Sequence, residues 1–241
     1  MTLAIIDCET TGLKWFNNGI ISLGAVDINS DDKFYEECRV SDDVEIDESS
    51  LEINGFKKEE LKQKDKKSEG EVFKDFKNWC NYHNVNAISG FNVSFDIMFL
   101  YGVARRNNID FSGFPNYYYD IKEIFERNVL MDISNQPIIN DVCRRYNISV
   151  GFPPRVHVSL DKTLKFYNID EDEPKPHIAI NGALYATEIY FLIKYKTHYL
   201  ERFANVSIPD YLSTLNFDFG PPARIDHLVS SSENILKQQS L

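Results

Sequence analysis

Short runs of apolar residues, each ended by polar residues, mark the first forty positions of the chain. Leu3–Ile6 is a fully apolar run that stops at Asp7. Ile20–Ile28 and Phe34–Val40 are two further runs of strand length and strand composition. Apolar runs of this length that turn residues bound are typical of buried strands. The pattern therefore predicts that the chain begins with three strands of one sheet.

Strand and helix patterns alternate after these three runs. Residues 72–82 carry apolar side chains at helical spacing, and Ala87–Phe91 is another short strand pattern. Ser94 then has the position of a helix N-cap, with the helix running through Arg106. Further helices are predicted from residue 121, over 137–146, over 159–167 and after His177. Strands followed by alternating strands and helices predict a mixed α/β fold, a central sheet flanked by helices.

The pattern changes near residue 199. Gly220-Pro221-Pro222 and Ser230–Ser232 have loop composition, yet Phe203 and Phe217 are too apolar for a plain linker. We therefore predict a domain over 1–198 and a C-terminal extension over 199–241 that packs on it and frays at its end.

The negative net charge limits how this chain can bind a polyanion such as a nucleic acid. Lys and Arg number 26 and Asp and Glu 37, which gives a formal net charge of −11. A protein that coats a nucleic-acid backbone by bulk charge is basic, so a local patch or a metal would be needed here. Residues 57–67 hold six lysines; a solvated helix face is the simple interpretation and a phosphate-facing patch the alternative.

The cysteines and the N-terminus bear on location. The four cysteines, Cys8, Cys38, Cys80 and Cys143, form no C-x-x-C pair. This excludes the usual zinc and redox motifs and favours a reducing compartment. We expect a cytoplasmic protein without a signal peptide or a membrane-spanning helix, because no long apolar stretch occurs.

Two carboxylates end the first apolar run. Asp7 and Glu9 lie two residues apart, and strand geometry directs both side chains to one face. A D-x-E pair is common and is often merely solvated. At the end of a buried strand, however, two acids are costly unless a cation lies between them, and Mg²⁺ prefers such oxygen ligands. The turn Thr10–Leu13 that follows offers backbone N–H groups to a phosphate or a terminal nucleotide.

Two later segments add candidate residues. In GFNVSFD (90–96), Asp96 enters the first turn of a helix, where the helix dipole alone would explain an acid. In PHIAINGALYATEIY (176–190), His177 precedes a long helix. Such a histidine is often a capping or packed residue, and if it is functional it is a general base, since imidazole titrates near neutral pH.

These segments together resemble one enzyme family. IIDCETTG, then GFNVSFD, then SLDKTLKFYNI and H-x-A-I resemble in order and spacing the DnaQ-like DEDD exonucleases of the histidine subtype (DEDDh). The likeness covers about residues 1–195. It implies an RNase H-like fold, two bound Mg²⁺ or Mn²⁺ ions, and removal of nucleotides from 3′ ends of single-stranded DNA or RNA.

The resemblance also implies roles for particular residues. Asp7, Glu9 and Asp96 would hold the metal ions, with Asp7 bridging them, and His177 would activate the attacking water. The family contacts the terminal nucleotide at the positions of Thr10, Thr11, Leu13 and Asn92, with Leu13 as an apolar wedge against its base.

One position departs from the family pattern. The family has its fourth carboxylate five residues after the histidine, and this chain has Gly182 there. Neither Asn181 nor Glu188 replaces it, because both point elsewhere around the helix. Either this chain carries an inactivating substitution, which we favour, or it is a natural variant with a weakened site. On the first view, Gly182→Asp should raise activity by roughly 100-fold or more.

Other functions stay open at this stage. A degenerate nuclease that binds nucleic acid or a protein without cutting is the main alternative, and Gly182 keeps it open. An α/β hydrolase or a nucleotide-binding enzyme is disfavoured, since G-x-S-x-G and a phosphate-binding glycine loop are absent from the sequence. The choice of DNA or RNA and the oligomeric state, a homodimer included, are not determined.

Overall fold

A mixed six-stranded sheet forms the centre of the computed structural model, which describes residues 2–151, 155–156 and 158–239. Its strand order is β3-β2-β1-β4-β5-β8. Pairing is antiparallel for β1–β2, β2–β3 and β5–β8 and parallel for β1–β4 and β4–β5. The strands are β1 Leu3–Thr10, β2 Ile20–Asp27, β3 Lys33–Glu37, β4 Ala87–Gly90, β5 Tyr117–Asp120 and β8 Ala223–Arg224. The three predicted N-terminal strands and the mixed sheet are confirmed.

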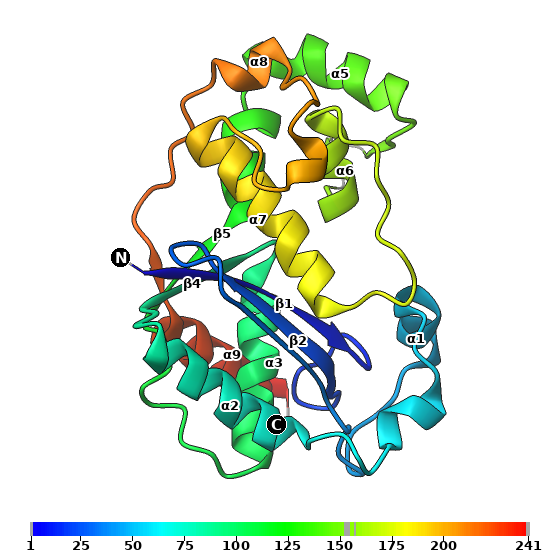
Figure 1. Cartoon of the computed structure of the whole chain (residues 1–241), viewed down its shortest axis with the longest axis vertical. Helices are drawn as coiled ribbons and strands as arrows, with labels where there is room; N and C mark the ends of the chain where they lie inside the picture. Colours follow the sequence, from blue (N-terminus) through cyan, green and yellow to red (C-terminus); the bar gives the residue numbers. More distant parts are fainter. Residues whose placement is uncertain (1, 152–154, 157, 240–241) are drawn as a thin grey trace.

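Helices cover both faces of this sheet (Figure 1). One face carries α2 Glu69–Tyr82, α3 Val93–Arg106 and α9 Ile225–Gln239. The other carries α4 Ile121–Phe125, α5 Gln136–Arg145, α6 Leu160–Phe166, α7 Ala179–Tyr195 and α8 Asp210–Ser213. Short elements complete the chain: α1 Glu48–Asn54, η1 Lys58–Lys62, η2 Glu126–Leu130, η3 Ile133–Asn135, η4 Glu201–Phe203, and a small hairpin of β6 Val150–Gly151 and β7 Arg155–Val156.

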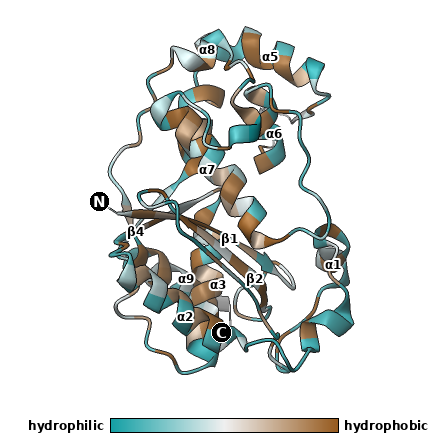
Figure 2. Ribbon diagram, viewed as in Figure 1, coloured by the Kyte–Doolittle hydropathy of each residue, from teal (hydrophilic) through white to brown (hydrophobic). Residues whose placement is uncertain are grey.

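Strand β1 separates two apolar cores by its alternation. Leu3 and Ile5 pack into the core beneath α7, whereas Ala4 and Ile6 pack into the core beneath α3. Because side chains alternate along a strand, each position of β1 is assigned to one face. Hydrophobic residues concentrate along β1, β2 and the inner sides of α3 and α7, as Figure 2 shows.

A glycine in β2 lets α7 approach the sheet closely. A Cβ on Gly24 of β2 would collide with the backbone of Ala179, the first residue of α7. Gly24 is also the residue that pairs with Asp7 across β1–β2. The first turns of α7 therefore lie directly over the end of β1 that carries Asp7.

The C-terminal segment wraps around one edge of the sheet. Phe203 and Leu212 are buried in the core beneath α7, β8 then pairs with β5, and Ile225 of α9 is buried in the core beneath α3. The prediction of loop at Ser230–Ser232 is wrong, because α9 continues through these residues and packs Leu228 and Val229 against that core. The predicted fraying falls on residues 240–241, outside the described part of the chain, and the boundary at 198 stays a prediction.

The lysine-rich segment forms only one short helical turn, η1. Lys62 bonds to the carbonyls of Val40 and Ser41 and pairs with Asp42. Lys66 and Lys67 pair with Glu37 and Glu36 of β3. These lysines thus neutralise neighbouring acids, which supports the simple interpretation of a solvated segment. Within the described residues, no helix has the length and apolarity that crossing a membrane requires.

Candidate active site

Asp7 and Glu9 project from the end of β1 toward α7. They occupy the same face as Leu3 and Ile5, which pack beneath α7. Burial raises the pKa of Asp7 from 3.8 to about 7. Burial, followed by the charges of Asp7 and Glu173, raises the pKa of Glu9 from 4.5 to about 8. Without a cation beside them, these two carboxylates are costly to ionise.

Asp96 joins them from α3. Its side chain is buried, and its pKa is raised well above 3.8, first by burial and then by the charge of Asp7. A hydrogen bond from the Cys8 backbone acts in the opposite sense and favours the charged form. Asp7 therefore interacts electrostatically with both Glu9 and Asp96, at the place where β1 ends and α3 begins.

Asp120, at the end of β5, fixes the loop between β4 and α3. Asn92 has a left-handed backbone (φ 67°), a conformation that asparagine tolerates better than most residues. Its N–H donates to Asp120 Oδ1 at 3.1 Å, and Asp120 also caps α4. The helix begins at Val93 with Asn92 as the capping residue, so the predicted N-cap at Ser94 is two residues late. The sharp turn at Asn92 places Asp96 in the first turn of α3.

His177 precedes α7 by two residues. Its backbone N–H donates to the carbonyl of Asn54 at 2.7 Å, which holds this segment against α1. Its side chain is 24% exposed. Burial, and then the charge of Lys175, lowers the pKa of His177 below 6.5. The imidazole is therefore mainly neutral at pH 7 and can accept a proton.

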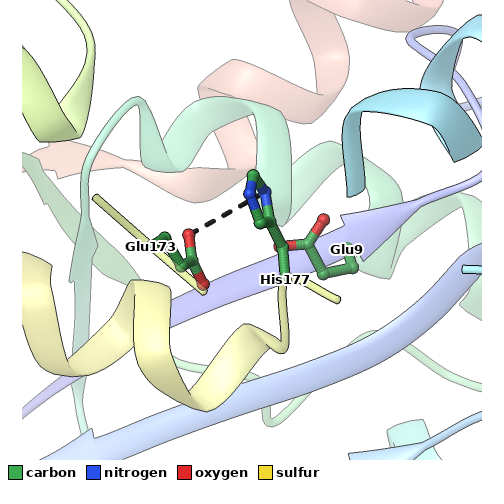
Figure 3. Close-up of side chains that lie close together, drawn as sticks. All are labelled: Glu9, Glu173 and His177. Atoms are coloured by element: carbon green, nitrogen blue, oxygen red, sulfur yellow. Dashed lines mark ion pairs between the residues drawn. The ribbon is translucent and has the colours of Figure 1, made fainter. Parts of the chain in front are cut away.

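Glu173 is the site residue that the sequence analysis missed. Ligand atoms of Glu9, Glu173 and His177 all lie within 4.8 Å of one another (Figure 3). Glu173 Oε2 is 4.0 Å from His177 Nδ1. Burial and then the charge of Asp7 raise the pKa of Glu173 from 4.5 to about 8. The only sequence signal was its position, an acid four residues before the histidine, at the end of an acidic run and next to a proline.

Gly182 lies in α7 opposite Asp7. A Cβ at this position would be 2.6 Å from Asp7 Cγ, too close for any real contact. Glu188, six residues further along α7, points away from the site as predicted. Its buried carboxylate accepts hydrogen bonds from the backbone N–H groups of Tyr199 and Leu200 and contacts His198 Nδ1. Helix α7 thus brings no carboxylate to Asp7.

The turn after β1 is mostly occupied by internal hydrogen bonds. The Thr11 N–H donates to the Gly19 carbonyl, so the expectation that this turn leaves its N–H groups free is wrong at Thr11. The Thr11 hydroxyl is buried and donates to the Glu45 carbonyl, and the Thr10 hydroxyl donates to that of Gly12. These side chains stabilise the turn, and its exposed residue is Leu13, at 77%.

A surface hollow lies beside this turn. Leu13 and Asn92, two of the four predicted nucleotide contacts, both line it. The other lining residues are Trp15, Ser94, Phe95, Met98 and Phe99, together with Leu228 and Ser232 of α9. The lining is largely apolar and aromatic, which suits the face of a nucleobase. The sequence pattern predicts loop at Ser230–Ser232 and gives no indication of this contribution from α9.

The arrangement suits a hard divalent cation. Among the described residues, no lysine or arginine forms an ion pair with Asp7, Glu9 or Asp96, although Asp96 is buried and Asp7 and Glu9 are partly buried. Glu173 Oε1 is also buried and has no hydrogen-bond partner. Unpaired buried carboxylate oxygens are rare because they are costly, and divalent cations are the groups that commonly satisfy them. The residues present therefore fit the metal ions that the resemblance implies.

Comparison with known proteins agrees with this geometry. Residues 4–190 match the model of the RNase T family, described as exonuclease. A structure of E. coli exonuclease I with a dT13 oligonucleotide superposes with a TM-score of 0.60 at 17% identity, covering 80% of this chain and 41% of that chain. The chain therefore spans about two fifths of exonuclease I.

Two further structures show the same fold. The nuclease domain of 3′hExo, a DEDDh family member bound to rAMP, has a TM-score of 0.55 at 12% identity, covering 87% of this chain and 96% of that domain. Cell-death related nuclease 4 has a TM-score of 0.56 at 15% identity, covering 82% and 64%. A comparison with curated protein sequences gave no match. Since the family model covers most of the sheet, its helices and the acidic site, this chain belongs to the RNase T family of exonucleases, on an RNase H-like fold.

Proposed function

We propose that this chain is a metal-dependent 3′–5′ exonuclease that removes nucleotides from the ends of single-stranded DNA or RNA. The observation that supports the proposal is that Asp7 interacts with both Glu9 and Asp96, while His177 lies beside Glu9. Membership of the exonuclease family supports phosphodiester hydrolysis at this site.

The site residues have two roles, metal binding and proton transfer. Asp7, Glu9 and Asp96 would hold two Mg²⁺ or Mn²⁺ ions, which when bound stabilise the attacking and leaving oxygens of an in-line displacement. His177, neutral at pH 7, accepts the proton of the attacking water. Asn92, held by Asp120, and Leu13 contact the terminal nucleotide in the hollow that they line.

Bound cations would also overcome the repulsion between this acidic chain and a nucleic acid. A chain of net charge −11 repels a polyanion unless positive charge is concentrated where the phosphate binds. Bound ions at the acidic site supply that charge locally. Exonuclease I structures hold dT13 and dA16 oligonucleotides, which supports a single-stranded substrate here.

Gly182 bears on the level of activity. Position 182 offers no ligand, so we expect lower activity than from a site with four carboxylates unless another residue supplies the fourth. The alternative function is a degenerate nuclease that binds nucleic acid or a protein partner without cleavage, and Gly182 is the observation that favours it.

The deciding experiment is digestion of 5′-labelled single-stranded DNA and RNA with Mg²⁺, with Mn²⁺ and with EDTA. We expect metal-dependent, stepwise shortening from the 3′ end by wild type and none by His177→Ala. His227→Ala is the matched control, because His227 is exposed on α9.

A closed single-stranded circle provides the test of polarity. An exonuclease leaves it intact, whereas its cleavage would contradict the proposal. Binding of the linear strand without shortening in any metal would favour the alternative function.

A further inference from the structure

The acidic run Asp170–Glu173 lies between α6 and α7. Its four acidic side chains differ in whether they have an ion-pair partner. Asp170 and Asp172 pair with Lys165, at 3.6 and 3.2 Å. Glu171 pairs with Arg202 and accepts a hydrogen bond from the Tyr185 hydroxyl. Three of the four acids therefore have ordinary partners of their own.

Glu173 is the exception. No lysine or arginine pairs with it in the described part of the chain, and its nearest basic group is His177 Nδ1, at 4.0 Å. Its Oε1 atom is buried and accepts no hydrogen bond. Removing a carboxylate oxygen from water without a partner is unfavourable, so either a bound proton or a positive group must compensate it.

The place where Glu173 lies is the candidate active site. Its carboxylate is within 4.8 Å of ligand atoms of both Glu9 and His177. In Figure 3 the Glu173 side chain, from the segment before α7, and the Glu9 side chain, from β1, lie on either side of His177. A positive group bound at this place would therefore contact two carboxylates at once.

Helix α7 does not supply the fourth carboxylate. Position 182 is a glycine, and the Asp7 side chain fills the space into which a side chain there would extend. An acid that reaches the same group of carboxylates from the preceding segment would take over the missing charge.

We propose that Glu173 is a metal ligand of this site and replaces the carboxylate that is absent at Gly182. The inference rests on the proposed function, since it assigns a further residue to the same metal centre. Glu9 and Glu173 would share an ion, and His177 remains free to accept a proton.

Metal binding tests this directly, without reference to catalysis. Binding of Mn²⁺ is measured by electron paramagnetic resonance and by calorimetry for wild type, Glu173→Gln, Glu9→Gln and Asp172→Asn. Glu173→Gln removes the charge and keeps the shape. Asp172→Asn removes the same charge one residue away, from a side chain that is 81% exposed.

We expect Glu173→Gln to weaken Mn²⁺ binding by roughly 10–100-fold or more, on the scale at which loss of supporting groups lowers metal affinity. Glu9→Gln should do the same, and Asp172→Asn should stay within about twofold of wild type. The melting temperature should rise with Mn²⁺ concentration in wild type and much less in Glu173→Gln.

Other outcomes separate the two proposals. If Glu173→Gln binds Mn²⁺ like wild type while Glu9→Gln does not, the ligand role of Glu173 is wrong and the proposed nuclease stands. If Glu173→Gln only shifts the pH profile of cleavage, Glu173 positions His177 and the inference is overturned. If wild type binds no Mn²⁺ and cleaves nothing, the proposed function itself fails.

Discussion

The Asp7 carboxylate occupies the space in which a side chain on residue 182 would begin. A Cβ on Gly182 would be 2.6 Å from Asp7 Cγ. The two residues come from β1 and α7, and the close approach of α7 over Gly24 of β2 brings them together. The glycine therefore does more than omit a ligand, because it also makes room for Asp7.

Gly182→Ala should lower metal affinity. Replacing a helical glycine by alanine usually stabilises a helix by about 1 kcal/mol. Here the added methyl group displaces Asp7, so we expect Mn²⁺ binding to weaken by roughly 10–100-fold. Calorimetry measures the change, with Asn181→Ala on the neighbouring position of α7 as the control. Unchanged binding would show that Asp7 can move without loss of the site.

Gly182→Asp separates the two explanations of the missing carboxylate. The sequence alone led us to expect a gain of roughly 100-fold or more in activity. The position of Asp7 changes that expectation: with Glu173 present, the new side chain must displace Asp7, and activity on a labelled strand should not rise. A rise of that size would favour an inactivating substitution and contradict the replacement by Glu173.

The stability of the metal-free protein should fall as pH rises. Asp7 has a pKa of about 7 in the folded chain and 3.8 ordinarily. Between these values the folded state holds a proton that the unfolded state has lost, so the free energy of unfolding decreases with pH up to about 7. We expect the melting temperature in EDTA to drop less between pH 5 and pH 8 for Asp7→Asn than for wild type. Asp170→Asn, at an exposed acid, should follow wild type.

Glu188 should be a structural residue and not a catalytic one. Its fully buried carboxylate accepts from the N–H groups of Tyr199 and Leu200, at 2.9 and 2.7 Å. Hydrogen bonds to a charged group contribute about 1.5–3 kcal/mol each. Glu188→Gln should therefore lower the free energy of unfolding in urea by about that amount, whereas Glu201→Gln, on an exposed residue, should not. Loss of Mn²⁺ binding with unchanged stability would contradict this assignment.

Leu13 should contribute to substrate binding. It is 77% exposed and lines the hollow with Asn92 and Phe95. Burial of a leucine side chain against a base contributes on the order of 1.5–3 kcal/mol, so Leu13→Ser should weaken binding of a short single strand by about tenfold or more. Fluorescence anisotropy in Ca²⁺ measures this without cleavage. Ile133→Ser, at an 85% exposed residue, is the control, and equal affinities of the two variants would exclude a role for Leu13.

Local sequence patterns predicted the fold class and pointed to most residues of the candidate site. The apolar run Leu3–Ile6 indicated a buried strand, and the period of two placed Asp7 and Glu9 on one face. Local patterns suffice for these features because strand alternation and helix starts depend on neighbouring residues. For the same reason, an error of two residues at Asn92 did not affect the placement of Asp96 in the first turn of α3.

The tertiary structure decided what lies across from these residues. Glu173 and Glu9 are 164 residues apart in the chain, and only the packing of α7 on β1 and β2 brings the two carboxylates together. Likewise, the serines of α9 have loop composition, and α9 forms there because Leu228 and Val229 pack against the core beneath α3. Contacts between distant segments depend on how elements pack, and a local pattern of residues carries no information about the partner across the gap.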